Sequence, residues 1–201
     1  MTFFDDLPEP PPRPRQPQPL RSGWSGPPSD ELPGVVPIGE FIHNSPRMVM
    51  ALKSVEVYST GCVLDVVWIV RRGEETDREW RDVMDQGFNH PGSSLSADVG
   101  LMVGVGYPDG RKAIASRPTP SMFEDDDVTG PVLTMIGGGG GSGNDDMVQS
   151  SAHYWLWPLP LEGDTRLVAK WEGLGMDEAS VVLSGEQVGE ALGRVRRFWT
   201  D

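Results

Sequence analysis

Histidine and cysteine most readily supply metal ligands, general bases and nucleophiles, and this chain has few of them. His43, His90 and His153 lie far apart, and Cys62 is the only cysteine. Protein zinc sites usually show such ligands in pairs at short spacing, which the sequence lacks. The Gly-x-Ser-x-Gly turn that exposes a nucleophilic serine is missing as well. The sequence therefore predicts no catalytic residues, no metal ligands and no cofactor, and it leaves ligand-binding residues unassigned.

A glycine run, Gly137 to Gly141 followed by Ser142 and Gly143, invites comparison with loops that hold phosphate. Phosphate-binding loops continue into Lys and Ser or Thr and open a helix whose amides face the anion. Here the next residues are Asn144-Asp145-Asp146, whose carboxylates would repel a phosphate. The composition favours a flexible loop between two strands over a nucleotide site.

Two acidic runs, Glu124 to Asp127 and Asp145-Asp146, offer carboxylate oxygens of the kind that calcium prefers. They would form a site only if their two loops met at one end of the fold. The alternating acids of a calcium-binding loop are absent, and acidic runs are usually solvated. We expect these residues to be exposed, with a calcium site as the alternative.

The densest apolar stretch runs from His153 to Leu161 and holds one Tyr, two Trp and three Leu, and the prolines Pro158 and Pro160 end its strand. In a strand, Trp155 and Trp157 point to one face, and Tyr154 and Leu156 to the other. Buried aromatic rings contribute much apolar area, so this strand is predicted to form the centre of the core. The alternative is an exposed Trp pair that stacks on sugars.

Composition places the chain in a broad class. Its 201 residues carry a formal net charge of -13, with a pI near 4.6, and include 25 glycines and 19 prolines. So much Gly and Pro favours turns and short strands, and so acidic a surface disfavours nucleic acid and anionic membranes. A lone cysteine excludes an intrachain disulfide, and neither a signal peptide nor a spanning segment is found. We therefore expect a cytoplasmic protein that binds neither nucleic acid nor membrane.

Residues 1–34 contain ten of the nineteen prolines and are predicted to form a disordered, proline-rich tail. The alternative is an arm that binds another protein, with Phe3, Phe4, Leu7 or Trp24 as anchors and arginines beside them. Whether Trp24 folds back onto the body is left open.

Residues 35–201 are predicted to form one immunoglobulin-like β-sandwich. A short inserted helix begins at Thr76 or Asp77, and a longer C-terminal helix is capped by Ser184 and runs to about Trp199. A change of apolar parity predicts a bulge near Lys53-Ser54. The expected strands are 35–42, 47–58, 62–70, 99–105, 111–116, 132–136, 147–157, 166–171 and 179–183.

Several segments occur in a fixed order: Tyr58-Ser59-Thr60-Gly61, the turn Tyr107-Pro108-Asp109-Gly110-Arg111-Lys112, the glycine run, and Tyr154-Trp155-Leu156-Trp157-Pro158-Leu159-Pro160. With them the chain resembles a family of uncharacterised, chiefly actinobacterial, β-sandwich proteins over residues 35 to 199. The Trp-Leu-Trp-Pro-Leu-Pro stretch is the most distinctive part. The resemblance implies fold and source, and it implies no activity.

These observations predict a non-enzymatic protein-interaction module whose partner is another protein, bound through the tail. The alternative is a sandwich that itself binds carbohydrate or calcium. An enzyme is the third option, because no catalytic set is visible. Oligomeric state is not indicated by the sequence.

Overall fold

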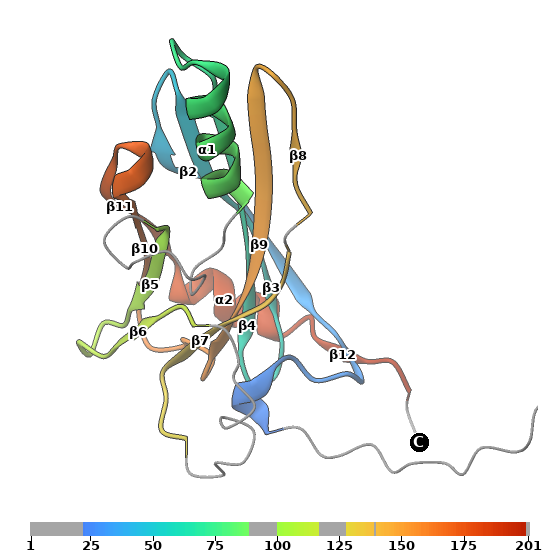
Figure 1. The fold of residues 1–201 in the computed structure, drawn as a ribbon. Coiled ribbons are helices and arrows are strands. Elements are labelled where there is room, and N and C mark those ends of the chain that lie inside the picture. Colours follow the sequence, from blue (N-terminus) through green and yellow to red (C-terminus); the bar gives the residue numbers. More distant parts are fainter. Residues whose placement is uncertain (1–21, 89–99, 117–127, 139, 200–201) are drawn as a thin grey trace, which may run out of the picture.

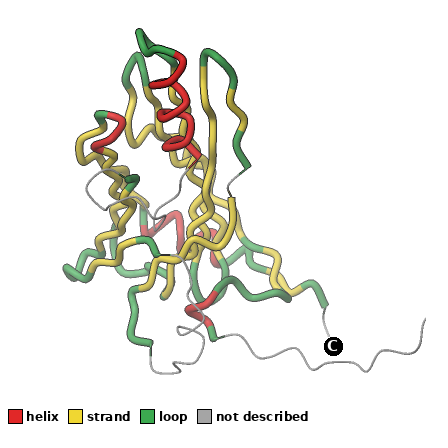
Figure 2. Tube along the Cα trace, in the orientation of Figure 1, coloured by secondary structure: helices red, strands yellow, loops and turns green. Residues whose placement is uncertain are grey.

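Two antiparallel sheets face each other across one hydrophobic core in the computed structural model, which describes residues 22–88, 100–116, 128–138 and 140–199 (Figure 1). Strands dominate this part of the chain (Figure 2). Its α-helices are α1 (Asp77–Phe88) and α2 (Gly185–Leu192). The predicted all-β sandwich is confirmed, while the immunoglobulin-like topology stays a prediction.

The larger sheet follows, in spatial order, β2 (Gly34–Asn44), β3 (Met48–Val57), β4 (Cys62–Arg71), β9 (Met147–Trp157) and β7 (Val132–Gly138), and β8 (Ser142–Gly143) also pairs with β9. The β3–β4 register shifts between Leu52 and Ser54, which confirms the predicted bulge. Pro37 lies on the edge strand β2, where its missing amide costs no central ladder bond.

The smaller sheet has the order β11 (Met176–Leu183), β10 (Thr165–Trp171), β5 (Met102–Gly106) and β6 (Lys112–Ile114). The predicted turn joins β5 to β6: the Tyr107 amide donates to the Arg111 carbonyl at 2.9 Å, and Gly110 takes a φ of 89°. Beyond β6, Ser116 forms a parallel bridge to Thr134 of β7. The two sheets are therefore joined by backbone pairing at one side.

Trp68 of β4 and Trp171 of β10 fill the space between the sheets, edge to face, with ring centroids 5.9 Å apart. Tyr154 and Leu156 of β9 point into the same core. Trp155 points to the opposite face of the larger sheet and packs with Tyr58, Val63 and Trp157 in a second cluster. The aromatic strand is thus central, but its Trp pair does not lie between the sheets.

The N-terminal segment covers that second cluster. The indole of Trp155 donates to the Gly23 carbonyl at 3.0 Å, and Trp24 is itself buried within the 3-10 turn Gly23–Ser25. The expected boundary between residues 34 and 35 is corrected here, because residues 22–34 pack on the body. The physical reason is that the outer Trp face of β9 needs an apolar cover. The rest of the expected tail, residues 1–21, lies outside the described residues.

The C-terminal helix is shorter than predicted. Ser184 caps it as expected, its hydroxyl accepting from the Gln187 amide at 3.4 Å, but α2 ends at Leu192 rather than near Trp199. After Gly193 the chain turns and forms β12 (Arg196–Arg197), which pairs with β1 (Glu31–Leu32). Backbone pairing with the N-terminal segment therefore replaces the last predicted helical turns.

The glycine run is also corrected. Gly137 and Gly138 belong to β7 and pair with His153 and Ala152 of β9. The short strand β8 pairs with Gln149 and Val148, near the start of β9. Gly138 has a φ of 95°, and a Cβ there would lie 2.5 Å from the Cα of Ala152. Gly137, Gly138 and Gly143 thus belong to strands, while Gly140, where a Cβ would meet nothing within 4 Å, lies in the connection between β7 and β8.

Candidate interaction surface

The residues that could do chemistry do not converge in the described part of the chain. His43 lies on the edge strand β2, and His90 lies outside the described residues. His153 faces Asp65 across β9 and β4, with Nε2 and Oδ1 3.6 Å apart. Asp65 also accepts from the Lys53 ammonium at 2.8 Å. Across the described ranges, no group of three or more His, Cys, Asp and Glu side chains is placed to hold a metal ion.

Cys62 is fully buried at the start of β4. Burial in apolar surroundings raises the pKa of its thiol to about 12. The thiolate is the nucleophilic form, and it is scarcely populated near neutral pH at such a pKa. Cys62 therefore contributes packing to the core.

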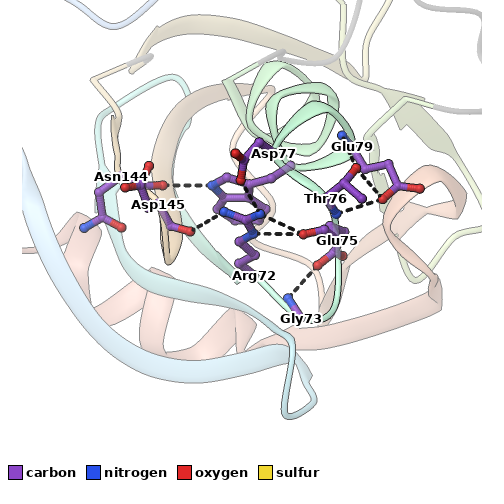
Figure 3. A network of polar contacts seen from close by, with 9 residues as sticks. Arg72, Gly73, Glu75, Thr76, Asp77, Glu79, Asn144 and Asp145 are labelled. Carbon is purple, nitrogen blue, oxygen red and sulfur yellow. Dashed lines mark hydrogen bonds and ion pairs between the residues drawn. The ribbon is translucent and has the colours of Figure 1, made fainter.

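Arg72 organises a polar network that joins the end of β4 to the start of α1 and to the turn before β9 (Figure 3). Its guanidinium donates to the Glu75 carbonyl at 2.8 and 3.1 Å and to the Asp77 carboxylate at 2.7 Å. It also reaches the Asp145 carbonyl at 3.4 Å. The hydrogen bond from Arg72, with its charge, lowers the pKa of Asp77. These bonds connect the start of α1 to the end of β4 and to the turn before β9, so the network anchors α1.

The acidic runs have different outcomes. Glu124 to Asp127 lies outside the described residues. Asp145 and Asp146 lie in the turn between β8 and β9, where the Asp146 carbonyl accepts from the Arg72 amide at 2.8 Å. Their described contacts are therefore those of a turn tied to β4.

The Trp pair of β9 does not form an exposed stacking platform. Trp155 is fully buried, and Trp157 is partly covered by the segment around Gly23. Tyr58 packs edge-on against Trp155, with ring centroids 5.8 Å apart. A sugar could reach the Trp155 ring only if residues 22–26 left it.

The exposed surface that stands out is what we call the C-terminal patch: Leu32, Arg196, Arg197, Phe198 and Trp199. Trp199 is 74% exposed, Phe198 52% and Leu32 48%. Leu32 pairs directly with Arg196, so both side chains share one face of the β1–β12 ribbon. The rings of Phe198 and Trp199 meet edge to face, 5.8 Å apart.

This ribbon is fixed to the body by specific bonds. Buried Glu31 accepts from the Ser59 hydroxyl at 2.6 Å and from the Ser59 amide at 2.9 Å, in the turn between β3 and β4. The Phe198 amide donates to the Asp30 carbonyl at 2.8 Å. The guanidinium of Arg194 donates to the Val35 carbonyl at 3.1 Å. The exposed aromatic rings therefore follow a short ribbon that is held to the body through Glu31 and Arg194, while the Phe198–Asp30 bond extends the ribbon itself.

The charges of the patch face solvent. Arg196 and Arg197 are exposed, and neither forms an ion pair with any other described residue. In a chain with net charge -13, they add positive charge beside an aromatic pair: Arg196 lies on the Leu32 face of the ribbon, and Arg197, which pairs with Glu31, lies on the opposite face. Sequence analysis missed this patch, because it assigned these residues to the last turns of a helix. The useful signal was Gly193 followed by a dense Arg and aromatic cluster.

Comparison with known proteins found no matching family model, no matching curated protein and no matching solved structure. The resemblance to actinobacterial β-sandwich proteins therefore stays a prediction. Neither α1 nor any other helix of the described ranges is long and apolar enough to cross a membrane.

Proposed function

We propose that this chain is a non-enzymatic protein-interaction module and that the C-terminal patch is its docking surface. The carrying observation is the exposure of Phe198 and Trp199 beside two arginines on a ribbon fixed to the body. Trp, Phe and Arg are the residue types enriched where protein interfaces concentrate their binding energy. A cytoplasmic location is part of the proposal, and it rests on the absence of disulfide chemistry.

The partner is a protein segment that carries carboxylates around an apolar side chain. Arg196 and Arg197 would meet the carboxylates, and the rings of Phe198 and Trp199 would cover the apolar group. The net charge of the whole chain opposes this attraction only over short range, since the Debye length is about 8 Å at physiological ionic strength. Binding is therefore expected to weaken as salt rises.

The expected binding arm needs a revised boundary. Trp24 is buried in the body and is not free to anchor a partner, which leaves Phe3, Phe4 and Leu7, outside the described residues. Deleting residues 1–34 would also remove Glu31 and the cover of Trp155. A test of the arm should therefore delete residues 1–21 only.

Affinity capture from cells that express the protein tests the proposal with matched variants. Phe198→Ser with Trp199→Ser should lose a set of partners that the wild type retains, and Arg196→Glu with Arg197→Glu should lose the same set. Phe41→Ser is the control, because Phe41 is 57% exposed but lies on β2, away from the patch. If the patch variants and the control capture identical proteins, the patch is not the docking surface.

A further inference from the structure

The outer face of the smaller sheet carries a second surface, separate from the C-terminal patch. Alternate residues of its strands enter the core, among them Val103, Val105 and Leu167. The residues between them face outward, and Ile114 is 67% exposed, Val182 50% and Met102 38%. No described element covers these side chains. The face therefore presents aliphatic groups to solvent.

A groove of about 240 Å³ runs along β5 on this face, and Gly104 and Gly106 form its floor. A Cβ at Gly106 would meet no atom within 4 Å, and one at Gly104 would meet only the Ala113 carbonyl oxygen, at 3.1 Å. Neither glycine has a positive φ. Neither position needs glycine for its backbone conformation. At Gly106 the surrounding space would also accept a larger side chain. Glycine inside a strand often marks a place where another chain or ligand approaches closely.

The strand register gives Gly106 and Gly104 neighbours of different chemical character. Gly106 pairs with Arg166 of β10 on one side and with Lys112 of β6 on the other. Strands lie about 4.8 Å apart, so two cationic side chains flank a gap with no side chain of its own. Neither cation forms an ion pair with another described residue. Lys112 lines the groove, and Arg166 lies beside it by register, so this end of the groove suits a carboxylate.

Gly104 lies two residues away, about 6.8 Å along the strand, and its neighbours are apolar. It pairs with Val168 of β10 and Ile114 of β6. Farther along, Met102, Lys170 and Glu178 line the groove, and Lys170 forms an ion pair with Glu172. The acids offset the cation at that end, so net positive charge is confined to the Gly106 end.

We propose that this groove binds an extended segment of a partner protein that carries a carboxylate and, two residues away, an aliphatic side chain. In an extended chain, residues i and i+2 point the same way and are separated by the distance between Gly106 and Gly104. The carboxylate lies between Arg166 and Lys112, and the aliphatic group lies between Val168 and Ile114. The inference goes beyond the C-terminal patch and stands without it.

Short Gly/Ser peptides test it by NMR titration of the full-length chain. The probe carries Glu-Ser-Leu, and its controls carry Gln-Ser-Leu, Glu-Ser-Ser, or Glu-Leu with the two side chains on opposite faces. Shifts should centre on Gly104, Gly106 and Ile114, and each control should bind about tenfold more weakly. Equal binding by the probe and the adjacent Glu-Leu peptide would overturn the inference, as would shifts centred elsewhere.

Variants of the protein separate groove occupancy from folding. Gly106→Ala and then Gly106→Val should weaken probe binding in that order, with an unchanged spectrum elsewhere. Lys112→Gln should weaken it too, while Arg78→Gln on the exposed face of α1 should not. If Gly106→Val does not fold, Ile114→Ser provides the test, since that side chain is exposed. Unchanged binding by these groove variants would contradict the inference.

Two other occupants give distinct results. Hexanoate binding as tightly as the probe would mean a small-molecule site and would overturn the assignment to a protein segment. The chain's own Asp5-Asp6-Leu7 has the same pattern. If Asp5→Asn with Leu7→Ser binds the probe more tightly than the wild type, that segment is the occupant and the external partner is wrong. Equal binding by this variant is the expected result.

Discussion

Trp155 and Trp199 show how differently one residue type is used in this molecule. Trp155 is fully buried and donates a hydrogen bond to the Gly23 carbonyl, whereas Trp199 is largely exposed. Trp155→Phe removes that bond and some buried area, and should lower the free energy of unfolding by about 2 kcal/mol. Trp199→Phe should change it by less than about 0.5 kcal/mol. Urea unfolding measures both, and equal effects would contradict the assigned environments.

Cys62 predicts a dependence of stability on alkaline pH. Burial raises the pKa of its thiol from 9.0 to about 12, so between these values the unfolded chain releases a proton that the folded chain keeps. The contribution to stability is complete below about pH 9 and is lost as pH rises through about 12, at up to about 1.4 kcal/mol per pH unit.

Urea unfolding at about pH 8 and about pH 10 checks this expectation. The free energy of unfolding should fall between these conditions in both proteins, and it should fall by about 1 kcal/mol more in the wild type than in Cys62→Ala. Tyrosine ionisation supplies the decline that both proteins share, because the ordinary pKa of Tyr58 is 10.0 and burial, followed by Glu56, raises it to about 12. Burial raises the pKa of Tyr107 and Tyr154 as well. Parallel declines in the two proteins would show that Cys62 is not the titrating group.

At the scale of elements, Gly34 and Gly106 have opposite roles. A Cβ on Gly34 of β2 would lie 1.9 Å from the Ala191 carbonyl oxygen of α2, whereas a Cβ on Gly106 of β5 meets nothing. Gly34→Ala should therefore cost on the order of 3 kcal/mol, since backbone must move. Gly106→Ala should be neutral or stabilise by up to about 1 kcal/mol. Thermal unfolding compares the two, and similar losses would contradict the packing of α2 on β2.

Arg72 predicts how α1 is attached. Arg72→Ala removes the bonds to the Glu75 carbonyl, the Asp77 carboxylate and the Asp145 carbonyl, so amides of α1 should exchange faster with solvent. The pKa of Asp77 should rise toward 3.8, because the Arg72 hydrogen bond and charge that lower it are gone. Arg78→Ala is the control. Hydrogen exchange and a carboxyl NMR titration give the readouts, and unchanged values in Arg72→Ala would refute the anchoring role.

Local signals explain which elements were predictable. The bulge near Lys53-Ser54 followed from a change of parity within one strand, and the Ser184 cap from a hydroxyl three residues before Gln187. Tyr107-Pro108-Asp109-Gly110 specified its own turn. Each of these features depends on residues adjacent in sequence, so one sequence was enough.

Elements decided by distant partners were not predictable in the same way. Residues 194–199 have apolar spacing compatible with a helix. Instead, β12 pairs with β1, a strand more than 160 residues earlier in the sequence. The glycine run reads as a loop until β9 is known to pair with it. The candidate surfaces share this origin: the C-terminal patch needs β1, and the groove needs the register of β10, β5 and β6.

At the scale of the whole molecule, the N-terminal segment decides where the folded unit begins. Residues 22–34 supply Trp24, the acceptor for Trp155 and the Glu31 carboxylate bound to Ser59. Deletion of residues 1–21 removes none of these contacts. Deletion of residues 1–34 removes all of them and uncovers a fully buried indole.

The two deletions should therefore behave differently. The shorter one should keep the unfolding midpoint of the full chain, within the error of the measurement. The longer one should lose several kcal/mol and shift tryptophan emission to the red, because Trp155 and Trp157 meet water and a buried hydrogen-bonded pair is broken. Trp24 leaves with the segment, so Trp24→Phe in the full chain controls for the lost fluorophore. Equal midpoints for both deletions would mean that the body folds from residue 35 and that residues 22–34 are an accessory cover.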